Sequence, residues 1–429
     1  MRNRTHTLRS TVMDKQQRTA LLLMALTVLI DITGFGLVIP LLPFWAEHFG
    51  ADAFMIGMLT SLYALAQFLF TPILGTLSDR YGRKPIIVVS LVIEALSLVL
   101  TALAGSLPML LVARFVGGLG ASNIGSAQAF VADVTPPEKR AQGMGMIGAA
   151  IGLGFVIGPA LGGLLAGPYP GLPFWIAAAV ALLNAVLVIV LLPESRKRLT
   201  GQEQRQSKKA SKSGIGAFFS GWGNLAHNPA VLSLILVNLL YTVAFTGMEN
   251  IFPLFTQHYF HWEATQNAYV FTYIGVIIVI MQGGLVSQLV KRWRERGVML
   301  AGLVLMALGL IALAFSTQLS WLMVTLGVLS IGDGAVSPTV STLLSFASPG
   351  ETQGELLGLS QGFAGLARII GPLIAGAIYK IGSAGTPFIV GGILVVLATL
   401  VAFPTIARVT QPAQPARADA VEVPSSSHD

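Results

Sequence analysis

The sequence predicts an all-α membrane protein, with twelve transmembrane helices in two pseudo-symmetric six-helix bundles and both termini in the cytoplasm. The first observation behind this prediction is composition: of 429 residues, 54% are hydrophobic and 10% are charged, whereas soluble domains carry about 25% charged residues. The second is a series of apolar segments, each near the ~20 residues that a helix needs to cross a bilayer. The third is the clustering of lysine and arginine at alternate connections.

The apolar segments define the expected helices. In chain order they cover residues 20–45, 54–77, 85–104, 107–131, 141–166, 172–192, 230–257, 266–290, 298–316, 319–346, 354–380 and 385–407. Basic residues test this count independently, because cytoplasmic loops carry an excess of them. With both termini inside, 23 of the 26 Lys and Arg residues fall in inside segments, Arg114 and Arg368 fall within helices, and only Lys380 lies outside. Twelve crossings fit this distribution.

Charge and composition also exclude several function classes. The formal net charge of +7 follows from the topology and from contact with anionic lipid headgroups, so the expected partner is the bilayer and not nucleic acid. The chain has no cysteine, which excludes disulfides and thiolate chemistry. No HExxH motif or phosphate loop occurs, and we expect no catalytic residues, no metal and no cofactor. The first apolar run is too long for a secretory signal.

The two halves of the chain are copies of one unit. Short motifs recur at an offset of 213 residues, where Pro136, Glu138 and Gly158-Pro159 return as Pro349, Glu351 and Gly371-Pro372. A duplicated six-helix unit is typical of secondary transporters, whose site lies where the repeats meet. The expected domains are a basic cytoplasmic tail (1–19), an N-terminal six-helix bundle (20–193), a cytoplasmic linker with an interfacial helix (194–229), a C-terminal six-helix bundle (230–408) and a disordered cytoplasmic tail (409–429).

Ionisable side chains inside the predicted helices are the main candidates for function. There are six of them: Asp31, Glu94, Arg114, Glu249, Asp333 and Arg368. Each would cost ~2.5–3.5 kcal/mol if it faced lipid, so these groups must face a watered cavity or one another. Asp31 lies about eleven residues into its helix, near the bilayer midplane. The six groups form either a proton relay or substrate site, or structural pairs in which an arginine neutralises an acid.

Three motifs combine glycine with charge or proline. Residues 75–85 form a charge-dense turn between two apolar runs, and its basic residues place it on the cytoplasmic side. A degraded copy of this turn follows in the second half, where Gly75, Asp79 and Arg83 correspond to Gly284, Gln288 and Arg292. Arg114 precedes three glycines, and residues 154–163 join a GxxxG spacing to a proline. Glycines at such positions let two helices approach closely.

These motifs resemble those of the major facilitator superfamily, over nearly all of residues 18–407. Residues 75–85 resemble the signature between helices 2 and 3 of that family, residues 114–120 resemble its helix-4 signature, and residues 154–163 resemble the helix-5 pattern associated with antiporters. The first helix from Asp31 to Pro43 is similar to that of the twelve-helix drug:proton antiporters, particularly the tetracycline-efflux-type multidrug exporters. Residues 298–316 depart from the tetracycline exporters because they contain no ionisable side chain.

The resemblance implies a proton-coupled exporter of small amphipathic compounds. It would use alternating access and the proton gradient as its energy source, as a monomer in the bacterial inner membrane. The implied proton-coupling residues are Asp31, Arg114, Glu94 and Asp333. Candidate cavity residues, which could equally pack between helices, are Tyr63, Gln67, Asn123, Asn238, Tyr241, Glu249, Tyr273 and Arg368. The resemblance also implies a conformational latch between the halves, made of Gly75, Asp79, Arg80, Gly82 and Arg83. Residues expected to pack helix 5 are Gly154, Gly158, Pro159, Gly162 and Gly163.

Two other functions compete with export. A sugar or metabolite transporter of the same superfamily would need more Asn and Gln in the cavity and fewer buried acids than this sequence offers. An intramembrane enzyme is suggested faintly by Gly332-Asp333, a pair that also occurs in membrane aspartyl proteases. Ser330 stands where that motif needs glycine, and a second catalytic aspartate motif is missing, so the transporter remains the favoured interpretation.

Overall fold

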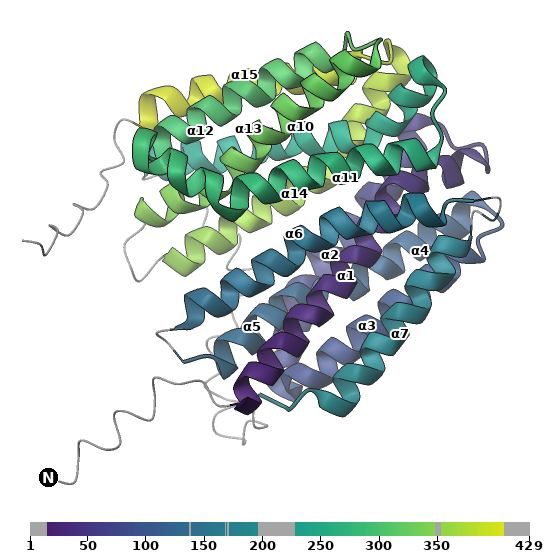
Figure 1. The fold of residues 1–429 in the computed structure, drawn as a ribbon, viewed down its shortest axis with the longest axis vertical. Coiled ribbons are helices and arrows are strands. Elements are labelled where there is room, and N and C mark those ends of the chain that lie inside the picture. Colours follow the sequence, from purple (N-terminus) through teal and green to yellow (C-terminus); the bar gives the residue numbers. More distant parts are fainter. Residues whose placement is uncertain are drawn as a thin grey trace, which may run out of the picture.

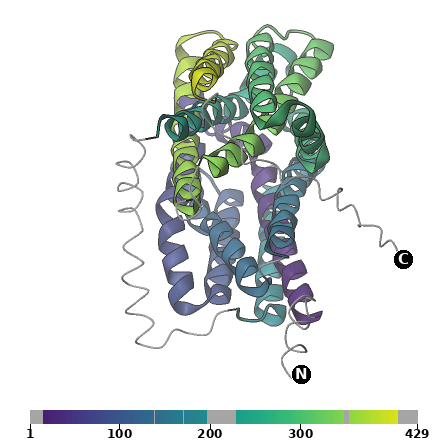
Figure 2. The ribbon, with the colours of Figure 1, turned by 90° about the vertical axis from the view of Figure 1, so that its left-hand side faces the viewer.

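The computed structural model describes residues 15–136, 139–167, 169, 171–195, 228–347 and 353–406. Every regular element within these ranges is helical. Figures 1 and 2 show two groups of long helices, one from each half of the chain, which lie side by side and approach each other most closely toward one end. Large apolar side chains are exposed on the outside of both groups, among them Leu164, Val190 and Phe403, as expected of surfaces that face lipid tails.

The first group contains seven helices. They are α1 (Lys15–Glu47), α2 (Ala53–Tyr81), α3 (Arg83–Ala102), α4 (Leu107–Gly120), α5 (Ile124–Val134), α6 (Arg140–Leu165) and α7 (Leu172–Leu191). A 3₁₀ turn, Ala121–Asn123, joins α4 to α5, so these two helices form one apolar segment, Leu107–Val134, with a break in its middle. The described part of the first helix includes a polar turn, Lys-Gln-Gln-Arg, ahead of the predicted apolar segment, and these residues are good helix formers.

The second group begins at α10 (Pro229–Phe260). It continues through α11 (Ala264–Ile280), a π-helical turn (Met281–Leu285), α12 (Val286–Leu313), α13 (Leu319–Phe346), α14 (Gln353–Ile381) and α15 (Thr386–Ile406). The sequence predicted two separate helices at 266–290 and 298–316, and the apolar stretch Ala264–Leu313 is indeed divided between these two ranges. The backbone is non-helical at Arg294, whose φ is 58°, within the predicted polar connection, and again at Gly284 in the π-helical turn.

Eleven apolar segments within the described residues are therefore long enough to cross a membrane. The predicted all-helical membrane fold is confirmed at this level. The predicted interfacial helix and most of the linker lie outside the described residues, as do residues 1–14 and 407–429 of the two tails.

The two groups join at one end of the molecule, which we call the Asp52 end after the residue between α1 and α2. The largest cluster of buried apolar residues contains Leu41 and Phe174 from the first group and Phe252 and Phe388 from the second. Two smaller clusters lie at the opposite end, which we call the motif end because the turn at Gly82 lies there, and each belongs to one group. The halves therefore share a core at the Asp52 end and have separate cores at the motif end.

Close backbone contact and hydrogen bonds link the halves along this shared core. α2 packs on α14 and α6 packs on α11. A methyl group added at Gly57 would lie 2.4 Å from the carbonyl oxygen of Pro372, which shows how closely α2 approaches α14. Four polar contacts cross the same boundary: Lys380 to Asp52 at 2.8 Å, Gln257 to Glu47 at 3.0 Å, Thr60 to Asn250 at 2.7 Å, and Ser61 to the carbonyl of Ile369 at 2.6 Å.

Candidate functional site

Two buried carboxyl groups meet in the middle of the first bundle. Asp31 on α1 and Glu94 on α3 are 8% and 6% exposed, and their side chains lie within hydrogen-bonding reach of each other. An ionised carboxylate can only accept hydrogen bonds, so two carboxyl groups can bond to each other only when one of them carries a proton. The pair is therefore a place where a proton can be held inside the membrane.

A break in the fourth apolar segment brings Asn123 to this pair. Asn123 is the last residue of the 3₁₀ turn between α4 and α5 and lies within hydrogen-bonding reach of Asp31. The Gln67 amide donates to the carbonyl of Ala121 at 3.1 Å, and the Ser122 hydroxyl donates to the carbonyl of Gly118 at 3.0 Å. Such bonds satisfy backbone groups that a helix break leaves free inside a membrane. Gln67 thus supports the turn that carries Asn123.

Arg114 lies beside Glu94 and an aromatic ring. Its Nη2 atom donates to the Thr101 hydroxyl at 3.0 Å, and its guanidinium carbon lies 5.8 Å from the centre of the Tyr63 ring. Its electrostatic neighbours are Glu94 and Tyr63. Among the described residues Arg114 forms no ion pair with an acid, so its predicted coupling to Asp31 would run through Glu94. That coupling stays a prediction.

An aromatic wall adjoins the carboxyl pair. The ring of Phe35 on α1 lies 5.3 Å from that of Tyr63 on α2 and 6.0 Å from that of Phe155 on α6, measured between centroids. Phe35 and Phe155 are half-buried. The sequence did not assign these two phenylalanines to the site, although both lie inside motifs that it singled out. The three rings offer an apolar aromatic surface next to the charged groups, in which Phe155 stands edge-on to Phe35.

The second bundle contributes a separate charged cluster. Glu249 on α10 interacts electrostatically with Asp333 on α13 and with Arg368 on α14, and Tyr241 interacts with the same two residues. Asp333 is 9% exposed, whereas Arg368 is exposed. Arg368 also interacts with Tyr63 of the first bundle, so its charge lies between the two halves and within range of both clusters.

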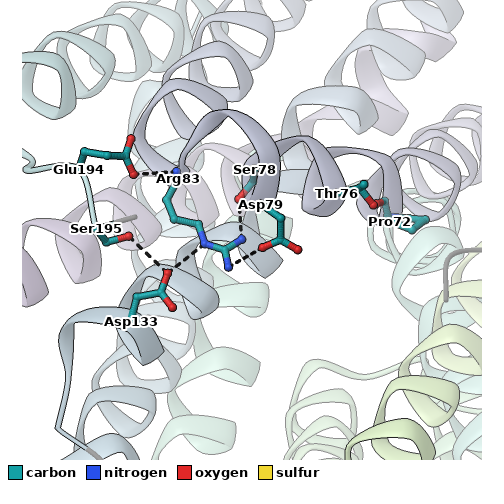
Figure 3. A network of polar contacts seen from close by, with 8 residues as sticks. All are labelled: Pro72, Thr76, Ser78, Asp79, Arg83, Asp133, Glu194 and Ser195. Atoms are coloured by element: carbon teal, nitrogen blue, oxygen red, sulfur yellow. Dashed lines mark hydrogen bonds and ion pairs between the residues drawn. The ribbon is translucent and has the colours of Figure 1, made fainter. Parts of the chain in front are cut away.

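The turn at residues 75–85 is held together by Arg83 (Figure 3). Its guanidinium group contacts Asp79 at 2.8 Å, Asp133 at 3.2 Å and the Ser78 hydroxyl at 2.8 Å. The carboxylate of Glu194, which follows α7, accepts a hydrogen bond from the backbone amide of Arg83 at 2.9 Å. Glu194 therefore binds a backbone amide at the amino-terminal end of α3.

All of these contacts lie within the first half of the chain. Gly82 has a φ of 105°, a backbone conformation that favours glycine, and Arg80 lies over the ring of Tyr81. A methyl group added at Gly75 would meet nothing within 4 Å. The role of this turn as a latch between the halves stays a prediction, because these contacts all connect residues of the first half.

The glycines of residues 154–163 lie where two helices approach closely. Methyl groups added at Gly154, Gly158 and Gly162 would each press on α1, and the nearest atom to the one at Gly158 would be the carbonyl oxygen of Thr33 at 2.6 Å. A methyl group added at Gly36 of α1 would contact Pro159, and one added at Gly163 would contact Ala268 of α11. The motif thus packs α6 against both α1 and the second bundle.

Comparison with known proteins decides the family. The sequence model described as Major Facilitator Superfamily matches residues 24–297 and 284–427. The chain belongs to the Major Facilitator Superfamily. It is 31% identical over 385 residues to the class C tetracycline resistance protein of Escherichia coli, covering 88% of this chain and 95% of that protein. It is 30% identical to multidrug resistance protein 1 of Bacillus subtilis (strain 168), covering 86% of this chain and 92% of that protein.

Solved structures agree on the fold of this superfamily. A bacterial homolog to the human lysosomal transporter Spinster, in an inward-facing and occupied conformation, matches with a TM-score of 0.77 and 15% identity over 92% of this chain and 98% of that chain. The human organic anion transporter MFSD10 (TETRAN) matches with a TM-score of 0.66 and 24% identity over 90% of this chain and 99% of that chain. This superfamily member is a multi-pass membrane transporter, and the resemblance to tetracycline and multidrug exporters is confirmed.

Two of the predicted cavity residues of this transporter form hydrogen bonds between helices, and their role in a cavity stays a prediction. The Asn238 amide donates to the hydroxyl and the carbonyl of Ser360 at 2.8 and 3.0 Å, which ties α10 to α14. The Tyr273 hydroxyl donates to the carbonyl of Met323 at 3.2 Å, which ties α11 to α13. Asp31, Glu94, Asn123 and Tyr63 come together, and Glu249, Asp333, Tyr241 and Arg368 form the second cluster. Among the described residues, no three His, Asp or Glu side chains gather as metal ligands would.

Proposed function

We propose that this transporter is a drug/proton antiporter that exports small amphipathic compounds from the cytoplasm of a bacterial cell. Twelve crossings with both termini in the cytoplasm are part of the proposal. The 50-residue stretch Ala264–Leu313 is about twice the length that one crossing needs. Residues 263–265 lie beside Trp45, and Ala314 contacts Gly385, both at the Asp52 end. The stretch therefore leaves and returns to the same end, which makes two crossings.

The observation that carries the proposal is the contact between Asp31 and Glu94. Both carboxyl groups are buried and lie within reach of each other, and an uncompensated charge at this depth is costly. Binding one proton lets the two groups bond to each other, and losing it leaves a repelling pair beside Arg114. Proton binding would therefore change the forces between α1, α3 and α4, which is how a proton gradient could drive a conformational change.

Alternating access would use the boundary between the halves. This conformation is joined at the Asp52 end, and the four polar contacts there would have to break before the transporter opened to the outside. One proton crossing the membrane supplies ~2.3 kcal/mol per 100 mV. That energy would drive the opening and reclosing of the boundary at the Asp52 end. Drug would be bound during one of these two movements and a proton during the other.

The substrate class follows from the walls of the site. The rings of Phe35, Tyr63 and Phe155 offer an apolar, polarisable surface, and such faces attract cations as well as flat ring systems. Carboxyl groups of both bundles lie nearby. We propose amphipathic, neutral or cationic compounds with aromatic rings, which agrees with relatives named for resistance to tetracycline and to several drugs.

The test is transport by purified protein in proteoliposomes. Asp31→Asn keeps the size of the side chain but removes the proton-binding group, so we expect drug transport driven by a pH gradient to fall by about 100-fold or more, to the level of empty vesicles. Glu263→Gln makes the same chemical change at an exposed carboxyl group on the cap of α11 and should transport normally. Thermal unfolding and drug binding show that each variant is folded. Undiminished gradient-driven transport by Asp31→Asn would refute the proposal.

A further inference from the structure

A layer of small hydroxyl side chains lies one helical turn from the carboxyl pair, on its motif-end side. Ser90 precedes Glu94 by four residues on α3, and Ser126 follows Asn123 by three residues on α5. Residues at these spacings lie on one face of a helix. α3 runs away from the motif end and α5 runs toward it, so both serines fall on the same side of the pair. α5 also packs against α1 and α3, which brings its face to theirs.

Unpartnered polar atoms gather in this region. Ser90 and Ser126 are 0% and 1% exposed, and among the described residues neither hydroxyl has a hydrogen-bond partner. Within the same part of the chain, one buried oxygen of Asp31 and one of Glu94 accept no hydrogen bond from a donor. Leaving a buried polar group without a bond costs about 1–3 kcal/mol, and folded proteins rarely leave such groups unsatisfied. Because the sequence spacing places all four at nearly the same level of the bundle, one common partner would satisfy them.

We propose that this space is a binding site for a small cluster of water molecules, held by Ser90, Ser126 and the free oxygens of Asp31 and Glu94. A buried water needs two to four polar partners, and the four atoms supply that number. Each hydroxyl can donate to or accept from water, and each carboxyl oxygen can accept. Thr27, the residue one turn from Asp31 on α1, is not needed, because its hydroxyl already bonds to the carbonyl of Leu23 at 2.9 Å.

The site is closed toward the motif end by an apolar layer. Met24, Ile87 and Phe130 each lie seven residues from Asp31, Glu94 and Asn123 respectively, which is one turn beyond the hydroxyl layer. All three are at most 1% exposed and belong to one buried apolar cluster. Water in the site therefore cannot form a continuous wire through the bundle to the motif end. Its role is local, between the two carboxyl groups.

The bound water would give the two carboxyl groups a second route, beside their direct contact, for exchanging one proton, a role that rests on the proposed proton coupling. The Asp31 O–H bond breaks as a new O–H bond forms on the water, and the water passes one of its own protons to the Glu94 carboxylate, so charge and atoms balance. The ionisable groups that face the pair are Tyr63 from α2 and Arg114 from α4. Those of α5 and α6, Asp133 and Arg140, lie at the motif end, and α7 contains none.

Thermal unfolding in detergent tests the site without any transport assay. If water occupies the site, Ser90→Ala and Ser126→Ala remove hydrogen bonds to that water, and each should lower Tm by about 1–3 °C. The control is Ser97→Ala, which removes a hydroxyl that already donates to the carbonyl of Ala113 at 2.7 Å and gives the scale of a lost bond. If the site holds no water, both substitutions remove a polar group that has no hydrogen bond, and Tm stays the same or rises. That result would overturn the proposal.

Transport kinetics test the role of the water separately. The double variant Ser90→Ala/Ser126→Ala should slow proton-driven transport several-fold while the Kd for drug stays the same, because neither hydroxyl belongs to the aromatic wall. An unchanged rate in this variant would remove the proton-exchange role. A failure of the Asp31→Asn experiment would refute antiport itself, and the Tm comparison would still decide whether the site binds water.

Discussion

At the scale of single residues, Asp52 illustrates how one side chain can serve two purposes. Its Oδ1 atom accepts a hydrogen bond from the backbone amide of Met55 and so caps α2, while Oδ2 contacts Lys380 of the other half at 2.8 Å. The hydrogen bond from Lys380 lowers the pKa of the Asp52 carboxyl below its ordinary value. Asparagine caps helices as well as aspartate does, so Asp52→Asn removes the charge and keeps the cap.

The sign of the pH dependence follows from the lowered pKa. The folded protein favours the ionised carboxylate, so the ion pair stabilises it at neutral pH, and this contribution is lost as the pH falls through the lowered pKa. Because both side chains are partly exposed, we expect only about 0.5 kcal/mol. Thermal unfolding should show Asp52→Asn slightly less stable than the wild type at pH 7, with the difference shrinking to zero as the pH falls through the lowered pKa. A difference that grows toward acid pH would contradict this account.

The sequence shows a residue of interest most clearly where a side chain does not suit its apolar surroundings. A carboxyl group in an apolar helix is costly, so the sequence alone singles out Asp31, Glu94 and Asp333. It does not reveal their partners, since the contact of Asp31 with Glu94 depends on how α1 and α3 are rotated against each other. Ser90 and Ser126 were missed because serine in a membrane helix usually bonds to its own backbone and carries no signal alone.

At the scale of helices, α6 is placed by its glycines. Gly158→Ala would bring a methyl group to within 2.6 Å of the carbonyl oxygen of Thr33 on α1, so the helices would have to separate. We expect a loss of about 1–3 kcal/mol in the free energy of unfolding. Gly148→Ala is the matched control on the same helix, since its methyl group would meet nothing within 4 Å and alanine favours helix by up to about 1 kcal/mol. Equal unfolding temperatures for the two variants would argue against the packing role.

Helix boundaries show why some elements could not be predicted. The apolar length of each segment predicted that α4 and α5 form one span. It did not predict the 3₁₀ turn between them, because that turn contains no proline and its sequence only weakly indicates a helix break. The turn is held by Gln67 on α2, a residue more than 50 positions away in sequence. The opposite case is Ala264–Leu313, where the charged residues predicted a connection between two helices and the backbone is non-helical at Arg294 within it.

At the scale of the whole molecule, the seam at the Asp52 end decides which way the transporter faces. Glycine contacts, one ion pair and three hydrogen bonds join α2 and α1 to α14 and α10 there. The internal repeat in the sequence predicted two similar halves, but it could not predict which end is joined, because one chain must adopt both arrangements in a transport cycle. The contacts of Arg83 with Asp79, Asp133 and Glu194 lie within the first half in this conformation, as expected if that end has come apart.

A reversible cross-link would test whether the seam must open. The hydroxyl of Thr60 on α2 lies 2.7 Å from the amide oxygen of Asn250 on α10, and the chain contains no cysteine, so Thr60→Cys/Asn250→Cys offers one clean pair across the halves. We expect oxidation to stop transport in vesicles and reduction to restore it. The matched control is Asn238→Cys/Ser360→Cys, whose side chains lie 2.8 Å apart within the second bundle, and its oxidation should leave transport intact. Full transport by the oxidised Thr60→Cys/Asn250→Cys protein would mean that the halves need not separate at the Asp52 end, and alternating access across this seam would be wrong.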